Sequence, residues 1–141
     1  MHGDGLGWRE QRERAVRAHA EAEARARATE QESAAKLVAR FAADATARRL
    51  PTVRLTATSY DGRYRYRTRI VGWYVDRARS RAVDAQGNFY LLTVPTSLRS
   101  LLFGAAPEPS PPPLVIGRGG RDGESLPLAE LLSQRLDAED G

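Results

Sequence analysis

The segment from Arg63 to Val75, RYRYRTRIVGWYV, alternates between two kinds of side chain with a period of two, which is typical of a β-strand. Four arginines fall on one face of the predicted strand, and we call them the arginine stripe: Arg63, Arg65, Arg67 and Arg69. The opposite face carries aromatic, hydroxyl and aliphatic side chains: Tyr64, Tyr66, Thr68 and Ile70. Gly72 indicates a bulge or a twist, after which Trp73 and Val75 are expected to face the core.

Shorter segments on both sides extend this strand into a sheet. The Asp61-Gly62 turn signal joins the basic strand to an alternating segment before it, and the turn at residues 86–88 joins two strands after it. The expected strands are residues 53–58, 63–75, 81–84 and 89–94, with a further short apolar strand at 114–116. This order predicts an antiparallel meander of about four to five strands.

The N-terminal third predicts a long helix. No glycine or proline occurs between Trp8 and Leu50, and many of these residues are alanine, which has the highest helix propensity. Several glutamates precede a basic residue by four positions, an orientation that stabilises a helix: Glu10–Arg14, Glu13–Arg17, Glu21–Arg25, Glu23–Arg27 and Glu32–Lys36. Pro51 ends the helix. A capping box at Thr29 to Glu32 leaves an alternative, in which the helix breaks there and folds back as a hairpin.

The two halves of this helix differ in what they can bury. The second half has an apolar face at helical spacing, which is expected to pack on a core: Ala34, Leu37, Val38, Phe41, Ala42 and Ala45. In the first half only Trp8 and Val16 are large and apolar. That half is therefore either a solvated helix or a projecting arm that pairs with itself or with a partner. The candidate interface residues of the arm are Trp8, Val16, Leu37 and Phe41.

The C-terminal third predicts two more helices. Thr96 or Ser97 is expected to cap a short helix that Gly104 ends and that packs on the sheet through Leu98, Leu101, Leu102 and Phe103. The proline-rich residues 105–113 predict an extended connector, or alternatively a docking ligand for an aromatic groove. Ser125 is expected to cap a final amphipathic helix with an apolar face formed by Leu126, Leu128, Leu131, Leu132 and Leu136.

These elements predict an α+β fold, with a long helix or helical hairpin followed by a small sheet, a short helix and an amphipathic helix. The expected organisation is a flexible leader (1–7), a helical arm (8–50), a small α+β domain (51–136) and an acidic tail (137–141). No long apolar run is present to span a membrane, and the N-terminus lacks the apolar region of a signal peptide, so a cytoplasmic location is expected.

Residue types for catalysis are scarce. The chain has no cysteine, and both of its histidines, His2 and His19, precede the predicted sheet. A glycine-rich segment at 117–125 stands where a phosphate site could form, but Asp122 occupies the position of the third glycine of the dinucleotide motif. We therefore predict no enzymatic activity, no cofactor and no metal site. Binding of a small anionic ligand at 117–125 stays an alternative.

The basic residues of the chain make the arginine stripe the main candidate binding surface. The net charge is +4, and 21 of the 22 basic residues are arginine. The stripe can be a solvated face, a site for an acidic partner or for the chain's own tail, or a nucleic-acid site with Tyr60 or Tyr74 available for stacking. The leading hypothesis is a non-enzymatic interaction or adaptor module. In it, the arm self-associates or docks and the stripe binds an acidic protein; nucleic-acid binding is the alternative.

Overall fold

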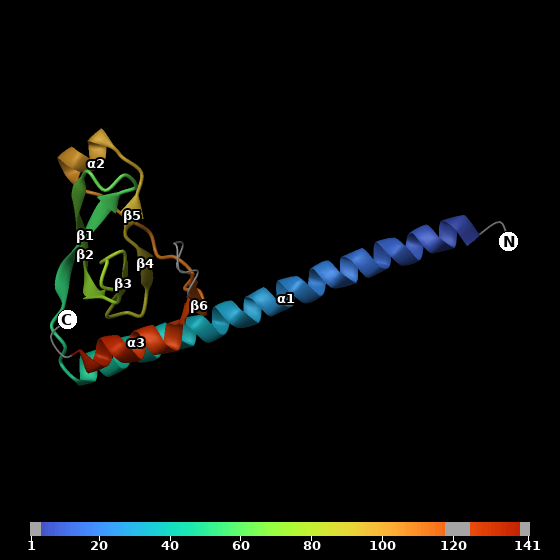
Figure 1. Ribbon diagram of the computed structural model, residues 1–141, viewed down its shortest axis with the longest axis horizontal. Coiled ribbons are helices and arrows are strands. Elements are labelled where there is room, and N and C mark those ends of the chain that lie inside the picture. Colours follow the sequence, from blue (N-terminus) through green and yellow to red (C-terminus); the bar gives the residue numbers. More distant parts are fainter. Residues whose placement is uncertain (1–3, 118–124, 139–141) are drawn as a thin grey trace.

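The computed structural model describes residues 4–117 and 125–138 and confirms the α+β fold (Figure 1). Its helices are α1 (Asp4–Ala47), α2 (Leu98–Phe103) and α3 (Leu128–Asp137). Five strands form the main sheet: β1 (Val53–Ser59), β2 (Arg65–Tyr74), β3 (Arg81–Asp84), β4 (Phe89–Leu91) and β5 (Thr93–Val94). A separate hairpin consists of β6 (Val115–Gly117) and β7 (Ser125–Pro127).

Helix α1 is continuous, so the hairpin alternative is wrong. Its 44 residues extend over about 66 Å at the usual rise per residue. The Thr29 hydroxyl donates to the Arg25 carbonyl oxygen one turn earlier, a bond that a residue makes inside a helix rather than at its N-cap. The predicted capping box therefore lies within uninterrupted helix.

Helix α1 is exposed from residue 8 to residue 33 and has one buried face from Ala34 onward. The predicted apolar face of its second half lies in the main core, where Ala34, Val38 and Phe41 are almost fully buried and Leu37 is partly buried. Helix α3 lies alongside this part of α1, while the remainder projects away from the domain (Figure 1). Every residue from 8 to 33 is exposed, and we call this stretch the projecting segment.

The main sheet closes on itself. The strand order is β4-β3-β2-β1-β5, and although β4 and β5 are at opposite ends of this order, only Leu92 separates them in the chain. The Leu92 amide donates to the Ser80 carbonyl oxygen on one side, and its carbonyl oxygen accepts from the Thr58 amide on the other. β5 is parallel to β1, so the meander is not antiparallel throughout.

A bulge in β2 lies before Gly72, at residues 68–70. The pairing with β1 changes register there, and Thr68 fills the irregularity because its hydroxyl donates to the Leu55 carbonyl oxygen and accepts from the Ile70 amide. Gly72 has another role. A Cβ at this position would lie 2.3 Å from the Val83 carbonyl oxygen, so the close approach of β2 to β3 requires glycine.

Apolar side chains from the two faces of the sheet form two cores. Trp73 and Val83 face the helices, and the Trp73 ring meets Phe41 edge-on with 5.8 Å between ring centroids. This result confirms that Trp73 and Val75 face the core. The opposite face encloses a second core within the curled sheet: Leu55, Ala82, Tyr90 and Leu92.

Helix α2 is capped as predicted but does not pack as predicted. The Ser97 hydroxyl accepts from the Ser100 amide, and the helix ends at Gly104. Its large apolar side chains are nevertheless exposed: Leu98, Leu101, Leu102 and Phe103. The prediction was wrong because the curled sheet fills its own interior, which leaves α2 at the edge of β2, where the Ala105 amide donates to the Arg67 carbonyl oxygen.

Ser125 is not the cap of the last helix. It belongs to β7, where it pairs with Gly117, and α3 begins only after Pro127. The predicted apolar face of α3 is confirmed, since Leu128, Leu131 and Leu132 are buried in the main core.

Alkaline pH should weaken the second core through Tyr90. Burial raises the pKa of Tyr90, and the hydrogen bond from its hydroxyl to Asp84 raises this pKa further. Unfolded tyrosine releases its proton near pH 10, whereas folded Tyr90 retains it, so the free energy of unfolding should fall as pH rises above about 10. In denaturant unfolding between pH 9 and 11.5, the free energy of unfolding should fall more steeply with pH for the wild type than for Tyr90→Phe. An equal dependence of the free energy of unfolding on pH in the two proteins would show that Tyr90 is not responsible for the loss of stability.

Candidate functional site

The arginine stripe lies on the outer face of the curled sheet. Arg65, Arg67 and Arg69 belong to β2, Arg63 lies two residues before the start of this strand, and all four residues are exposed. Arg65 and Arg67 pair in register with Thr58 and Thr56 of β1, which also face outward.

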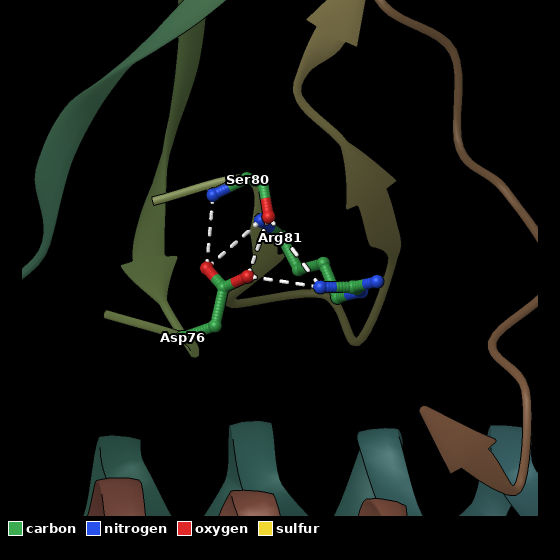
Figure 2. A network of polar contacts seen from close by, with 3 residues as sticks. All are labelled: Asp76, Ser80 and Arg81. Carbon is green, nitrogen blue, oxygen red and sulfur yellow. Dashed lines mark hydrogen bonds and ion pairs between the residues drawn. The ribbon is translucent and has the colours of Figure 1, made fainter. Parts of the chain in front are cut away.

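The stripe has no counter-charge within residues 4–117 and 125–138. None of its arginines forms an ion pair there. Arg81 provides a contrast, since its guanidinium lies 3.0 Å from the Asp76 carboxylate, which also accepts from the Ser80 amide and hydroxyl (Figure 2). Arg81 thus stabilises the turn between β2 and β3, whereas the stripe has no comparable contact within the two described ranges.

The two tyrosines predicted to accompany the stripe differ in environment. Tyr60 is 70% exposed beyond the end of β1. Tyr74 is half-buried; its hydroxyl accepts from the Thr56 amide at 2.8 Å, and the Arg79 guanidinium lies over its ring at 5.4 Å. Tyr74 is therefore engaged within the fold and belongs to a different site from Tyr60.

This second site is a cavity of about 270 Å³ that we call the arginine pocket. Its wall includes Tyr74 and three arginines from separate parts of the chain: Arg54 of β1, Arg79 of the β2–β3 turn and Arg135 of α3. This site cannot be predicted from the sequence, because no spacing or motif links three positions that only the tertiary fold brings together.

The residues predicted as the interface of the arm fall into two groups. Trp8 and Val16 are 60% and 64% exposed on the projecting segment, where the Arg12 guanidinium covers the Trp8 ring at 5.0 Å. Phe41 is buried in the main core of the same chain, so its assignment to a partner interface is wrong, and Leu37 packs against that core while staying partly accessible.

The glycine-rich segment falls largely outside the described residues, which omit 118–124. Over the two described ranges, no group of three or more histidine, aspartate or glutamate side chains is placed to hold a metal ion. No helix in those ranges is long and apolar enough to cross a membrane. Comparison with protein-family models, curated proteins and solved structures finds no match, so the function has to be inferred from the geometry of the chain itself.

Proposed function

We propose that this protein is a non-enzymatic assembly and adaptor module whose projecting segment pairs antiparallel with that of a second copy. The observation that carries the proposal is a stripe without charged side chains along the exposed face of α1. This stripe follows intervals of three or four residues, as one face of an α-helix does. It consists of Trp8, Gln11, Ala15, Ala18, Ala22, Ala26, Thr29, Ser33 and Leu37, and we call it the uncharged stripe.

The uncharged stripe is symmetric about Ala22. Ala18 and Ala26 lie at equal distances on either side of it, as do Ala15 and Thr29, and Gln11 and Ser33. At the ends of the stripe, Trp8 lies 14 residues before Ala22 and Leu37 lies 15 residues after it, so these two positions match to within one residue. A second copy of α1 that packs antiparallel, with Ala22 opposite Ala22, would therefore contact small residues along the stripe, and this permits close approach of the two backbones. Each exposed Trp8 would contact the partly accessible Leu37 of the other copy.

The charges beside the uncharged stripe favour the same arrangement. One flank alternates in sign: Glu10, Arg14, Glu21, Arg25, Glu32 and Lys36. A twofold axis through Ala22 maps this flank onto itself in reverse order, which places Arg14 near Glu32, Glu21 near Arg25 and Glu10 near Lys36. The other flank pairs Arg12 with Glu30 and His19 with Glu23.

Contacts within each chain are compatible with this pairing. The charged contacts along α1 are exposed. Arg14–Glu10 and Lys36–Glu32 are long at 3.8 and 3.7 Å, and His19–Glu23 is shorter at 2.9 Å, so these contacts add little stability and can rearrange. The core-facing residues of α1 lie roughly a third of a turn around the helix from the uncharged stripe. A second copy can therefore bind without displacing the domain.

Cysteine cross-linking tests the proposed pairing, because the chain has no cysteine of its own. Ala22→Cys places a thiol on the twofold axis, so mild oxidation should convert most of the protein to a disulfide-linked dimer. Ala24→Cys is the matched control, since it lies on the opposite face of α1 and should form little dimer. Mixing Ala15→Cys with Thr29→Cys should yield a heterodimer, whereas each alone should cross-link poorly. Equal cross-linking at positions 22 and 24, or a monomeric wild type at high concentration, would contradict antiparallel pairing.

The adaptor role rests on the arginine stripe. Its four exposed guanidinium groups form no ion pair in the described part of the chain, and each can bind a carboxylate in a bidentate manner. The neighbouring helix α2 adds exposed leucine side chains and Phe103, so the surface offers both charge and apolar area. Such a surface suits an acidic protein segment that also carries apolar residues.

Charge reversal on the arginine stripe should strongly weaken binding of this partner. Arg65→Glu with Arg67→Glu should reduce capture of an acidic partner from the native cell more than tenfold, because both guanidinium groups become repulsive to carboxylates. Arg9→Glu with Arg17→Glu, the same charge change on α1, should leave capture unchanged. Recovery of nucleic acid instead, with binding that falls steeply as salt increases, would replace the acidic protein with the nucleic-acid alternative.

A further inference from the structure

Helix α2 exposes a group of apolar side chains at one end of the domain. None of its residues is buried, and its four large apolar side chains are between 52% and 81% exposed. We call them the apolar tip: Leu98, Leu101, Leu102 and Phe103. Figure 1 shows α2 at the end of the main sheet that lies away from α1 and α3. Large apolar side chains that are exposed together indicate a surface that contacts a partner or a membrane.

The fold fixes α2 in this exposed position from both of its ends. Before the helix, the Ser97 amide donates to the hydroxyl of the buried Tyr66 at 3.1 Å. After the helix, the Ala105 amide donates to the Arg67 carbonyl oxygen at 2.8 Å. Gly104 makes this second contact possible, because its φ is 88° and a Cβ there would lie 2.8 Å from the same carbonyl oxygen. The apolar tip is therefore held outward by contacts that do not bury its own side chains.

The surroundings of the apolar tip are basic. The turn after β1 lies at the same end of the sheet, since the Tyr60 amide donates to the Val94 carbonyl oxygen shortly before α2. In residues 59–68 and 95–105, Asp61 is the single acidic residue, and its carboxylate already accepts from the Ser59 hydroxyl and the Arg63 amide. Four exposed arginines belong to the same two ranges: Arg63, Arg65, Arg67 and Arg99. An anionic surface is therefore the complementary partner.

We propose that the apolar tip docks on a bilayer surface that contains anionic lipids. Leucine and phenylalanine side chains can enter the boundary between headgroups and acyl chains while neighbouring arginines attract the lipid phosphates. The 70% exposed Tyr60 suits the same boundary, because its ring is apolar and its hydroxyl is polar. A bilayer accepts a projecting helix without a matching groove, which a protein partner would have to provide. The contact is peripheral, since no helix of the two described ranges is able to cross a membrane.

This proposal goes beyond the adaptor function and differs from it in the side chains that decide binding. The acidic protein is recognised mainly by the arginine stripe, whereas the bilayer requires the apolar tip. Arg65→Glu with Arg67→Glu, measured without lipid, therefore tests the adaptor function separately from membrane docking.

Co-sedimentation of the full chain with lipid vesicles tests membrane docking. The wild type should bind vesicles of three parts phosphatidylcholine to one part phosphatidylglycerol at least tenfold more tightly than vesicles of phosphatidylcholine alone, and less tightly as salt increases. Leu102→Ser and Phe103→Ser should each weaken binding to the mixed vesicles at least fivefold without unfolding the domain, because neither side chain is buried. Val16→Ser is the matched control, since Val16 is as exposed as Leu102 but lies on α1, and it should change binding less than twofold.

Three results would overturn the proposal. The first is no binding of the mixed vesicles by a wild type that is folded by circular dichroism. The second is an equal change in Leu102→Ser and Val16→Ser, which would show attraction to net charge alone. The third is equal binding to the mixed and the neutral vesicles, which would exclude a role for the arginines beside α2.

Discussion

Replacing Arg14 and Arg25 with glutamate is expected to dissociate the proposed dimer. On the alternating flank of α1, these two residues face Glu32 and Glu21 of the second copy, so the double substitution turns four attractive contacts into four repulsive ones. Each contact of this kind is worth about 0.2–0.5 kcal/mol and reverses sign with charge, so the total change is about 2–4 kcal/mol. This free energy corresponds to a dimer dissociation constant that increases about 30- to 1,000-fold. Sedimentation equilibrium measures this constant directly.

The complementary substitution makes the test specific for antiparallel pairing. Glu21→Arg with Glu32→Arg makes the same flank almost entirely positive and should dissociate the homodimer to a similar extent. An equimolar mixture of the two double variants should then form a heterodimer, because every altered contact regains opposite charges. Arg9→Glu with Arg17→Glu repeats the first charge change on the back of α1 and should leave the dimer intact. A mixture that stays monomeric would refute the proposed arrangement.

Truncation of Trp73 to alanine is expected to remove much of the stability of the domain. Its side chain is almost fully buried between the sheet and Phe41 of α1, and its Nε1 donates to the Leu50 carbonyl oxygen at 3.1 Å. Loss of a buried aromatic side chain costs about 3–5 kcal/mol. Domains of this size are commonly stable by only about 5–15 kcal/mol, so denaturant unfolding should shift to a much lower midpoint.

The other tryptophan is the natural control. Trp8 is exposed on the projecting segment, so Trp8→Ala should change the free energy of unfolding by less than about 0.5 kcal/mol when both proteins are monomeric. In Trp8→Ala the remaining fluorescence comes from Trp73, and its emission should move to longer wavelength as the main core unfolds. A small effect of Trp73→Ala would show that the contact between α1 and the sheet is weaker than its burial indicates.

The parts of the fold that follow from local periodicity were predicted from the sequence. The apolar positions from Ala34 to Ala45 follow the helical repeat, and the alternation around Tyr66 and Thr68 marks a strand with one buried face. Ser97 was identified as a cap because a side-chain bond of this kind depends only on neighbouring residues. Each of these features is determined within a few residues along the chain.

The wrong predictions about α2 and Ser125 and the unpredicted arginine pocket depend on residues that are not neighbours in the sequence. The leucines of α2 resemble a core-facing pattern, and only the filled interior of the curled sheet explains their exposure. Ser125 resembles a helix cap, but its pairing with Gly117 places it in a strand. The arginine pocket depends on tertiary placement too, since Arg54 and Arg135 come from opposite ends of the domain sequence. In contrast, the uncharged stripe is visible in the sequence once the projecting half of α1 is known.

The closure of the sheet at Leu92 affects how the chain must fold during synthesis. Residues on either side of Leu92 pair with β3 and with β1, so neither of those strands has both partners until residues 89–94 have left the ribosome. Until then the nascent chain presents unpaired strand edges, which are templates for aggregation. We therefore expect chains that end before Phe89 to aggregate and to require chaperones, whereas chains that extend beyond Val94 can close the sheet.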